Sequence, residues 1–404
     1  MSGMWNAFRL CLGGAGVVWA LLLASAGAQA MQFKVFYNFR GLAQRGRYDG
    51  DTPTGTLVAD KAGNLYGATF SGGQYLLGGV VFKITPDGTE SVLASINAGE
   101  RGPLDGVVLD NIGNLYGASW QQALLFQIAP DGTETDSYDI AQSAAERLLV
   151  DKAGNVYGTS ETGGAGCQRN GGQGCGTVFS VSPQGVVTTL YAFKGGPDGQ
   201  APFAGVIMDR SGNLYGTTTG GGLFGGGTVF RLAPNGTKSL LHSFGGGSDG
   251  AGPYAELIRD EAGNLYGTTF SGGGTGCSGY GCGTVFRLAP DGEETVLHAF
   301  AGGSDGSNPT FGLARDRAGN LYGTTNGLTL GQCGNAPNCG TAFQVAPDGT
   351  ETVLYTFPTS GGPPNGGLYI DKAGNLFGAM GGWKNNLGPN TNSLDHGAIY
   401  ELTK

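Results

Sequence analysis

The sequence predicts an all-β fold: a seven-bladed β-propeller of four-stranded blades, with the ring closed by the N-terminal strand. An element of the form Asp-x-x-Gly-Asn-(Leu/Val)-(Tyr/Phe)-Gly occurs seven times, and its successive copies lie between 41 and 58 residues apart. A period of this size is typical of a propeller blade. The last copy lacks a fourth strand, and the N-terminal end of the repeat region supplies a strand that matches the missing one. The glycine of each copy is Gly63, Gly113, Gly154, Gly212, Gly263, Gly319 or Gly374.

Each repeat contains four short β-type runs, here named a to d in chain order. In the fourth copy they are residues 204–209, 213–218, 227–232 and 240–244, with a Pro-Asn-Gly turn between c and d. Apolar alternation and turn residues indicate strands, and no segment after residue 30 has helical spacing. Glycine makes up 81 of 404 residues, a composition that would also fit disorder. The strict periodicity excludes disorder.

The chain ends predict how the ring closes. The last repeat has strands a, b and c at residues 367–371, 375–380 and 397–402, and then the chain stops. Residues 35–39, Val-Phe-Tyr-Asn-Phe, match the strand d runs at 296–300 and 353–357. Pairing the first strand with the last blade removes exposed sheet edges, whereas an open solenoid needs polar caps. We therefore expect a closed ring.

The repeat resembles a known family. Its Gly-Asn-Leu-Tyr-Gly-Thr-Thr, Gly-Thr-Val-Phe-Arg-Leu and Pro-Asp-Gly-Thr-Glu elements are similar to the GloVer-type tandem repeats of secreted bacterial proteins, over essentially the whole chain after residue 30. The resemblance implies an exported repeat protein without a settled activity. Members carry varied C-terminal anchors, and this chain departs from them by ending after its last strand. The strand layout is also similar to NHL-type and gluconolactonase-like propellers, which is an analogy of layout only.

The first 30 residues have the features of a secretory signal peptide. Arg9 precedes an apolar stretch at residues 10–24, and small residues follow up to Ala28-Gln29-Ala30, an A-x-A cleavage site. Glycines interrupt the apolar stretch, which is too short for a clean membrane span. We expect residues 1–30 to be removed and residues 31–404 to form the propeller in the periplasm or outside the cell, with no membrane span.

Six cysteines remain after that cleavage, in three close pairs. Even numbers of cysteines in local pairs on an exported chain predict disulfides. A zinc site would favour CxxC spacing with a second pair or histidines nearby, so we expect no metal and no cofactor. The formal charge of −9 argues against nucleic acid as a partner. The predicted disulfides are Cys167–Cys175, Cys277–Cys282 and Cys333–Cys339.

Two further motifs have structural interpretations. The Asp-x-x-Gly-Asn element resembles part of a calcium loop, but it lacks oxygen ligands at alternating positions and a distal glutamate. We expect its aspartate to accept backbone N–H groups and its glycine to supply a positive φ. His242 and His298 occupy a strand d position that is tyrosine in other blades, so we interpret them as packing residues. His396 has no repeat-wide equivalent.

The chain direction assigns the connections to two faces. The uniform a–b and c–d turns form one face, the turn face, and the variable b–c and d–a loops, with all the cysteine pairs, form the other, the loop face. Charged residues replace small ones near the start of the innermost strand in three blades, and the second blade has a short b–c connection. A concave channel mouth with polar groups and an aromatic residue is a default binding site. Its predicted residues are Asp105, Trp120, Glu146, Arg147 and Glu256. The alternative is that these are solvated loop residues with one ion pair.

The sequence favours a non-enzymatic exported binding or interaction module, acting as a monomer on a glycan or a cell-surface protein. No nucleophile–base pair, paired-carboxylate motif or metal cluster stands out from the repeat. One alternative is a lyase, lactonase or hydrolase on a carbohydrate-like substrate, with Asp105, Glu146 and Glu256 as acid, base or ligand groups. Another is a purely structural surface protein, which a flat and plugged channel mouth would favour.

Overall fold

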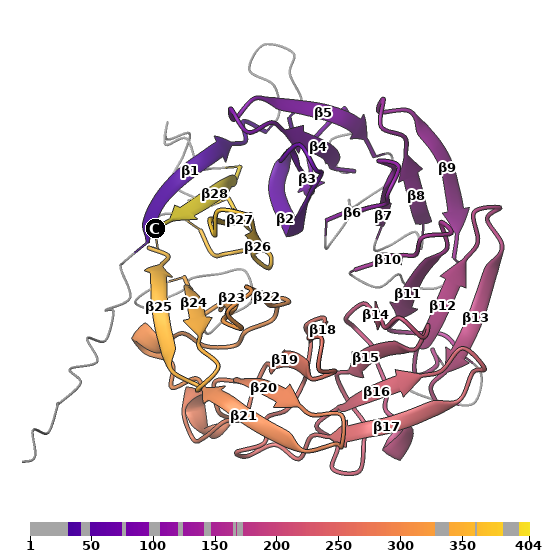
Figure 1. Ribbon diagram of the computed structural model, residues 1–404, viewed down its shortest axis with the longest axis vertical. Coiled ribbons are helices and arrows are strands. Elements are labelled where there is room, and N and C mark those ends of the chain that lie inside the picture. The colour runs from indigo at the N-terminus through magenta and orange to yellow at the C-terminus, as the bar shows by residue number, and fades with distance from the viewer. Residues whose placement is uncertain are drawn as a thin grey trace, which may run out of the picture.

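The structure is a computed structural model in which seven four-stranded antiparallel sheets are arranged in a ring (Figure 1). It confirms the predicted all-β, seven-bladed propeller. In every blade the strands follow the order a, b, c and d from the centre to the rim. The structure describes residues 31–41, 49–74, 78–96, 106–119, 124–140, 147–164, 167, 173–327, 339–359, 362–382 and 396–404.

The first three blades follow each other directly along the chain. The first contains β2 (Asp51–Ala59), β3 (Leu65–Ser71), β4 (Val80–Ile84) and β5 (Glu90–Ser95). The second contains β6 (Val108–Leu109), β7 (Leu115–Ala118), β8 (Leu124–Ile128) and β9 (Glu134–Asp139). The third contains β10 (Leu149–Val150), β11 (Val156–Ser160), β12 (Thr177–Val181) and β13 (Val187–Ala192).

The next three blades repeat this pattern with short 3₁₀ turns in some loops. The fourth contains β14 (Ile207–Met208), β15 (Leu214–Thr218), β16 (Thr228–Leu232) and β17 (Lys238–Ser243). The fifth contains β18 (Ile258–Arg259), β19 (Leu265–Thr269), β20 (Thr284–Leu288) and β21 (Glu294–Ala299). The sixth contains β22 (Ala314–Arg315), β23 (Leu321–Thr324), β24 (Thr341–Val345) and β25 (Glu351–Thr356). The turns are η1 (Gly196–Asp198), η2 (Cys277–Gly279) and η3 (Gly303–Asp305).

The seventh blade combines both ends of the repeat region. It contains β26 (Tyr369–Ile370), β27 (Leu376–Met380), β28 (Ala398–Thr403) and, as its outermost strand, β1 (Gln32–Asn38). β1 pairs antiparallel with β28, with Val35 opposite Tyr400. Beyond the strand, the backbone N–H of Phe39 donates to the carbonyl of Gly397 at 3.0 Å. The N-terminal strand therefore closes the ring, as predicted.

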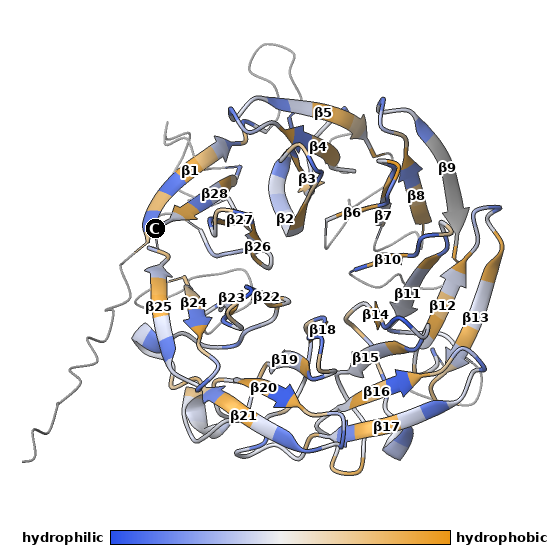
Figure 2. Ribbon diagram, in the orientation of Figure 1, coloured by the Kyte–Doolittle hydropathy of each residue, from blue (hydrophilic) through white to orange (hydrophobic). Residues whose placement is uncertain are grey.

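The core lies between neighbouring blades. Strand b carries a glycine that faces a phenylalanine of strand c: a Cβ on Gly267 would lie 2.7 Å from the ring of Phe286. That ring packs with Phe244 of the preceding blade, with the ring centroids 5.2 Å apart. Figure 2 shows polar and apolar segments alternating along the strands, as expected for sheets with side chains on two faces. The aromatic ring on strand c therefore explains why strand b carries a glycine at this position.

The turn face is held by the repeat aspartate. Asp209 accepts hydrogen bonds from the backbone N–H groups of Ser211 and Asn213, from the Asn213 amide and from the Tyr215 hydroxyl. Gly212 has a φ of 80°. Burial raises the pKa of Asp209, but the hydrogen bonds from Asn213 outweigh it and the net pKa is lowered. These contacts fit the structural interpretation of the motif.

The outermost strands run around the circumference of the ring. In Figure 1 the end of β17 lies near the start of β21, and the end of β21 lies near the start of β25. The turn η3, in the d–a loop of the fifth blade, contacts β25 of the sixth. Residues far from the channel therefore meet at each blade boundary. No helix within the described ranges is long and apolar enough to cross a membrane.

Candidate functional site

The innermost segments of neighbouring blades come into contact at one level of the channel. In each blade this level is the position four residues before the repeat aspartate. A Cβ on Gly205 would lie 2.4 Å from the carbonyl oxygen of Arg147, and one on Gly367 would lie 2.5 Å from Oγ1 of Thr56. Such distances are too short for a real Cβ, so small residues let neighbouring blades touch backbone to backbone. The seven residues at this level are Thr56, Gly106, Arg147, Gly205, Glu256, Gly312 and Gly367.

Two charged side chains occupy this constriction. Nη1 of Arg147, from the third blade, lies 3.1 Å from Oε2 of Glu256, from the fifth blade. The pair spans Gly205 of the fourth blade, and its side chains are only 23% and 14% exposed. The ion pair therefore joins two blades that are not neighbours in the ring, and two of the five predicted site residues are in contact. The other three, Asp105, Trp120 and Glu146, lie outside the described residues.

A cavity of about 710 Å³ adjoins the ion pair. Its wall includes the a–b turn residues 60–62 and 110–113, so it opens toward the turn face. Apolar side chains of the innermost strands alternate with charged groups, and no described lining residue carries a hydroxyl, thiol or imidazole. The lining residues are Val58, Ala59, Asp60, Lys61, Ala62, Val108, Leu109, Asp110, Asn111, Ile112, Gly113, Arg147, Leu148, Leu149, Val150 and Glu256.

The cysteines form disulfides on the loop face. Cys167 bonds to Cys175 and Cys277 bonds to Cys282, with Cα–Cα separations of 5.5 and 5.3 Å. Each bond lies in its own b–c loop. Cys339 is also disulfide-bonded, and its predicted partner, Cys333, lies outside the described residues.

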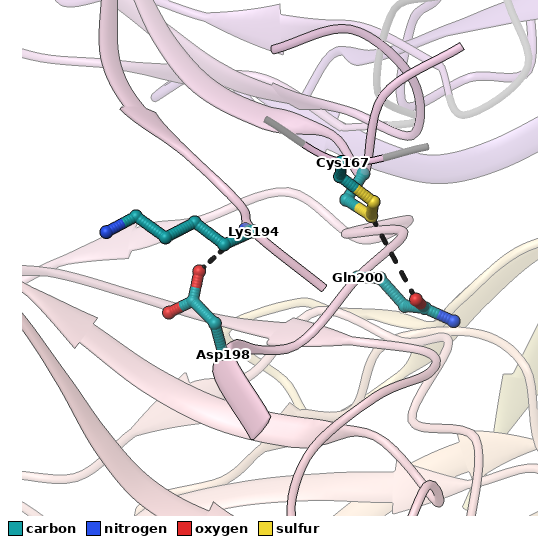
Figure 3. The surroundings of a disulfide bond; sticks show 5 residues. Cys167, Lys194, Asp198 and Gln200 are labelled. Carbon is teal, nitrogen blue, oxygen red and sulfur yellow. Dashed lines mark hydrogen bonds between the residues drawn. A yellow bond between two sulfur atoms is a disulfide. The ribbon is translucent and has the colours of Figure 1, made fainter. Parts of the chain in front are cut away.

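Each of these two disulfides packs under the d–a loop of its own blade. A Cβ on Gly195 would lie 2.9 Å from Sγ of Cys175, and one on Gly302 would lie 3.2 Å from Sγ of Cys282. Figure 3 shows the third-blade loop, where Asp198 accepts a hydrogen bond from the Lys194 backbone and Gln200 lies beside the disulfide. The bonds therefore support loops that carry an aspartate.

These aspartates belong to polar clusters that the sequence analysis missed. Three successive blade boundaries carry a tyrosine or histidine late in strand d, an aspartate in the following d–a loop, and a charged residue at the start of the next strand d. We call them rim clusters. The three successive ones are Tyr191–Asp198–Lys238, His242–Asp249–Glu294 and His298–Asp305–Glu351. A further cluster of this kind, Tyr37–Asp49–Glu90, lies between the seventh and the first blade.

The rim clusters revise the interpretation of the histidines. His298 does pack edge-on against Phe300, but its Nε2 also lies 3.2 Å from Oδ1 of Asp305. Burial and the charge of Asp305 raise the pKa of Glu351 to about 7. The signal that could have revealed the clusters is an Asp-Gly step in which the aspartate follows the strand d tyrosine or histidine by seven residues.

Solved structures with a similar fold support the propeller architecture. Virginiamycin B lyase from Staphylococcus aureus, in selenomethionine-substituted form, matches 93% of this chain and 99% of its own at 11% identity, with a TM-score of 0.62. The extracellular domain of a one-component system from B. thetaiotaomicron matches 92% of this chain and 40% of its own at 11% identity, with a TM-score of 0.54. At such low identities the likeness shows the fold alone.

The sequence itself identifies the family. No curated protein matches the chain significantly. The family model described as the Gloeobacter/Verrucomicrobia repeat matches residues 165–390, more than half of the chain, and agrees with the resemblance of the repeat motifs. The chain therefore belongs to the Gloeobacter/Verrucomicrobia repeat family.

Proposed function

We propose that this protein is an exported, non-enzymatic binding module that holds a small neutral polar ligand, of the glycan class, in the channel cavity. The observation that carries the proposal is the Arg147–Glu256 pair beside a cavity of about 710 Å³. Ligand pockets commonly have volumes of about 300–1,000 Å³ and combine apolar walls with a few fixed polar groups. The described lining fits this pattern.

The ion pair favours a neutral ligand over a charged one. The two opposite charges compensate each other within 3.1 Å, so an ionic ligand would have to displace one partner and leave the other uncompensated. A hydroxyl group can accept a hydrogen bond from the guanidinium and donate one to the carboxylate. A glycan fragment offers such hydroxyls and also apolar ring faces for Val58 and Leu109, which line the same cavity.

Export is supported by the cysteine chemistry. The bonds Cys167–Cys175 and Cys277–Cys282 are of the kind that persists in oxidising compartments. We propose that residues 1–30 direct secretion and are removed, and that the remaining chain acts as a monomer. A shift of the N-terminus to residue 31 in the secreted protein, measured by intact mass, tests this. A full-length N-terminus in the exported fraction would contradict it.

The binding proposal is tested with a double variant. Arg147→Met/Glu256→Gln removes both charges and keeps similar volumes, so no unpaired charge remains. The secreted protein is screened on a glycan array, and hits are measured by calorimetry. We expect the variant to fold and to lose binding. The control is Lys34→Met/Glu401→Gln, which removes the 3.6 Å ion pair between β1 and β28. Unchanged binding by the Arg147/Glu256 variant would overturn the proposal.

The same preparations distinguish the enzymatic alternative. Each glycan or lactone that binds is incubated with the protein, and product formation is followed by mass spectrometry. Turnover that is lost in Asp105→Asn or Glu146→Gln, with binding retained, would replace the binding module with an enzyme. Binding without turnover supports the module.

A further inference from the structure

The three successive rim clusters, from the third blade to the sixth, place different chemistry on one scaffold. Lys238, Glu294 and Glu351 are equivalent, because each is the first residue of its strand d and pairs with the last residue of its strand c. Tyr191, His242 and His298 are equivalent by the same pairing, each opposite the second residue of strand c. The fold therefore brings the same three positions together at the boundaries between blades three and four, four and five, and five and six.

The first rim cluster contains a cation supplied by the protein. Nζ of Lys238 lies 2.8 Å from Oδ1 of Asp198 and 2.6 Å from the carbonyl oxygen of the same residue. The lysine side chain is only 6% exposed. The ammonium group also lies 5.6 Å from the centre of the Tyr191 ring. At this boundary a positive charge therefore lies beside the aspartate, to which the Tyr191 hydroxyl also donates directly at 2.8 Å.

The other two rim clusters replace that cation with a carboxylate. Histidine stands in place of Tyr191, and glutamate stands in place of Lys238. Oε1 of Glu294 and Oε1 of Glu351 are each shielded from solvent and have no hydrogen-bond partner among the described residues. In the third cluster, one ligand atom from each of His298, Asp305 and Glu351 lies within 4.8 Å of the others. In the third cluster, two carboxylates and an imidazole thus lie together at the position equivalent to the one where the first cluster holds an ammonium group.

We propose that His298, Asp305 and Glu351 bind a divalent cation of the zinc type. We propose further that His242, Asp249 and Glu294 form a second copy of this site once the Glu294 side chain moves inward, since of these two clusters only the His298 cluster has all three ligand atoms within 4.8 Å of one another in this structure. One imidazole and two carboxylates are ligands that zinc accepts. Bond lengths of about 2.0–2.2 Å in a tetrahedral site place neighbouring ligand atoms about 3.3–3.6 Å apart. Nε2 and Oδ1 already lie 3.2 Å apart in the His298 cluster and 3.0 Å apart in the His242 cluster.

Two of the three ligands are held in place without a metal. Oδ2 of Asp305 accepts the backbone N–H of Ala301 at 2.5 Å, which leaves Oδ1 directed at the histidine. The His298 ring packs edge-on against Phe300 with the ring centroids 4.8 Å apart. Only the flexible Glu351 side chain has to move inward. Such support by surrounding contacts is what orients metal ligands in known sites.

The test introduces the lysine of the first cluster at the equivalent positions of the other two. The secreted protein is stripped with chelator, titrated with zinc chloride by calorimetry, and analysed for bound zinc by mass spectrometry. We expect two equivalents in the wild type. Glu351→Lys and Glu294→Lys each transplant the arrangement of Lys238 and should each lose one equivalent, because an ammonium group fills the site. Tyr191→His/Lys238→Glu should gain one equivalent.

The outcomes separate a metal site from a purely structural cluster. The control is His396→Gln, which removes the remaining histidine and should keep both equivalents. If a lysine variant fails to fold, Glu351→Gln keeps the volume, removes the charge and should lose the same equivalent. The proposal is overturned if the wild type binds no zinc, or if both lysine variants keep the stoichiometry of the wild type.

Discussion

The turn face and the rim of this propeller use aspartate in opposite ways. On the turn face every repeat aspartate accepts the same amide bond from its own asparagine, from Asp60 and Asn64 in the first blade to Asp371 and Asn375 in the last. At the rim, Asp198 holds a lysine, whereas Asp305 faces a histidine and a glutamate. The turn face repeats one chemistry, and the rim varies it on a constant backbone.

This difference indicates different roles for the turn face and the rim. A turn motif with all its partners inside six residues is satisfied locally, so its repetition stabilises the fold in every blade. A rim cluster draws its residues from two blades, so each boundary can change independently. Lys238, Glu294 and Glu351 show this change at equivalent positions. Residues that differ while their backbone stays the same are where specific binding is expected on a repeat scaffold.

The largest expected effect comes from opening the ring, on which both regions depend. Deleting residues 31–40 removes β1 and the buried Phe39, and it exposes the edge of β28. Removing one buried phenylalanine costs about 3–5 kcal/mol, and losing the whole strand should cost more. We expect a strongly lowered melting temperature by calorimetry, while the control Val35→Ala, on the outer surface of β1, stays near the wild type. An unchanged melting temperature in the deletion would contradict ring closure as a source of stability.

The next effect concerns the contribution of the repeat aspartate to the stability of the turn face. Asp209→Ala removes the acceptor for two backbone N–H groups, the Asn213 amide and the Tyr215 hydroxyl. We expect a loss of about 2–3 kcal/mol in the free energy of unfolding, because charged hydrogen bonds in the turn are lost. Denaturant unfolding measures it. The control is Asn235→Ala in the following c–d turn, where one backbone N–H bond is lost. Equal losses in both variants would mean that the aspartate has no special role.

A smaller effect concerns the disulfides under the rim. Short loops gain about 2–3 kcal/mol from a crosslink in the chain-entropy estimate. Reduction should therefore increase hydrogen exchange in residues 273–283 and 301–306 of the fifth blade while the ring stays folded. Residues 220–227 of the fourth blade, which contain no cysteine, are the internal control. Mass analysis after alkylation without reductant adds a check, since labelling of all six cysteines beyond residue 30 would refute the disulfides.

The smallest effect is the acid dependence of the turn face. The folded-state pKa of Asp209 is lowered by its hydrogen bonds despite burial, so its contribution to stability is present above the unfolded pKa, near 4. That contribution is lost as the pH falls through the folded pKa. In the Asp209→Asn variant, the melting temperature should fall less steeply below about pH 4. The difference corresponds to less than about 1 kcal/mol in the free energy of unfolding, because the site is near solvent. Exposed Glu261→Gln is the control, and an identical acid profile in Asp209→Asn would contradict this assignment.

The fold was predictable because its determinants recur at a regular interval. Seven copies of one motif and the matching strand at residues 35–39 were sufficient for the blade number and for the closure by β1. For Arg147 and Glu256, the sequence predicted only that both residues lie in the same region of the channel. Both residues stand four positions before their repeat aspartates, which places them at one level of the channel. Their separation by a whole blade, with Gly205 between them, could not be read from the spacing.

The rim clusters were missed because their partners come from different repeats. His298 and Glu351 are 53 positions apart and look like unrelated exceptions when each repeat is read alone. Their contact arises because the outer strands follow the circumference, so the end of β21 lies near the start of β25 (Figure 1) and the turn η3 contacts β25. The sequence by itself determined the repeat, the strands, the turns and the local disulfides, since these depend on residues that are close along the chain. The tertiary structure alone decided which charges meet across the channel and at the rim, because the twist of each blade and the closure of the ring bring distant residues together.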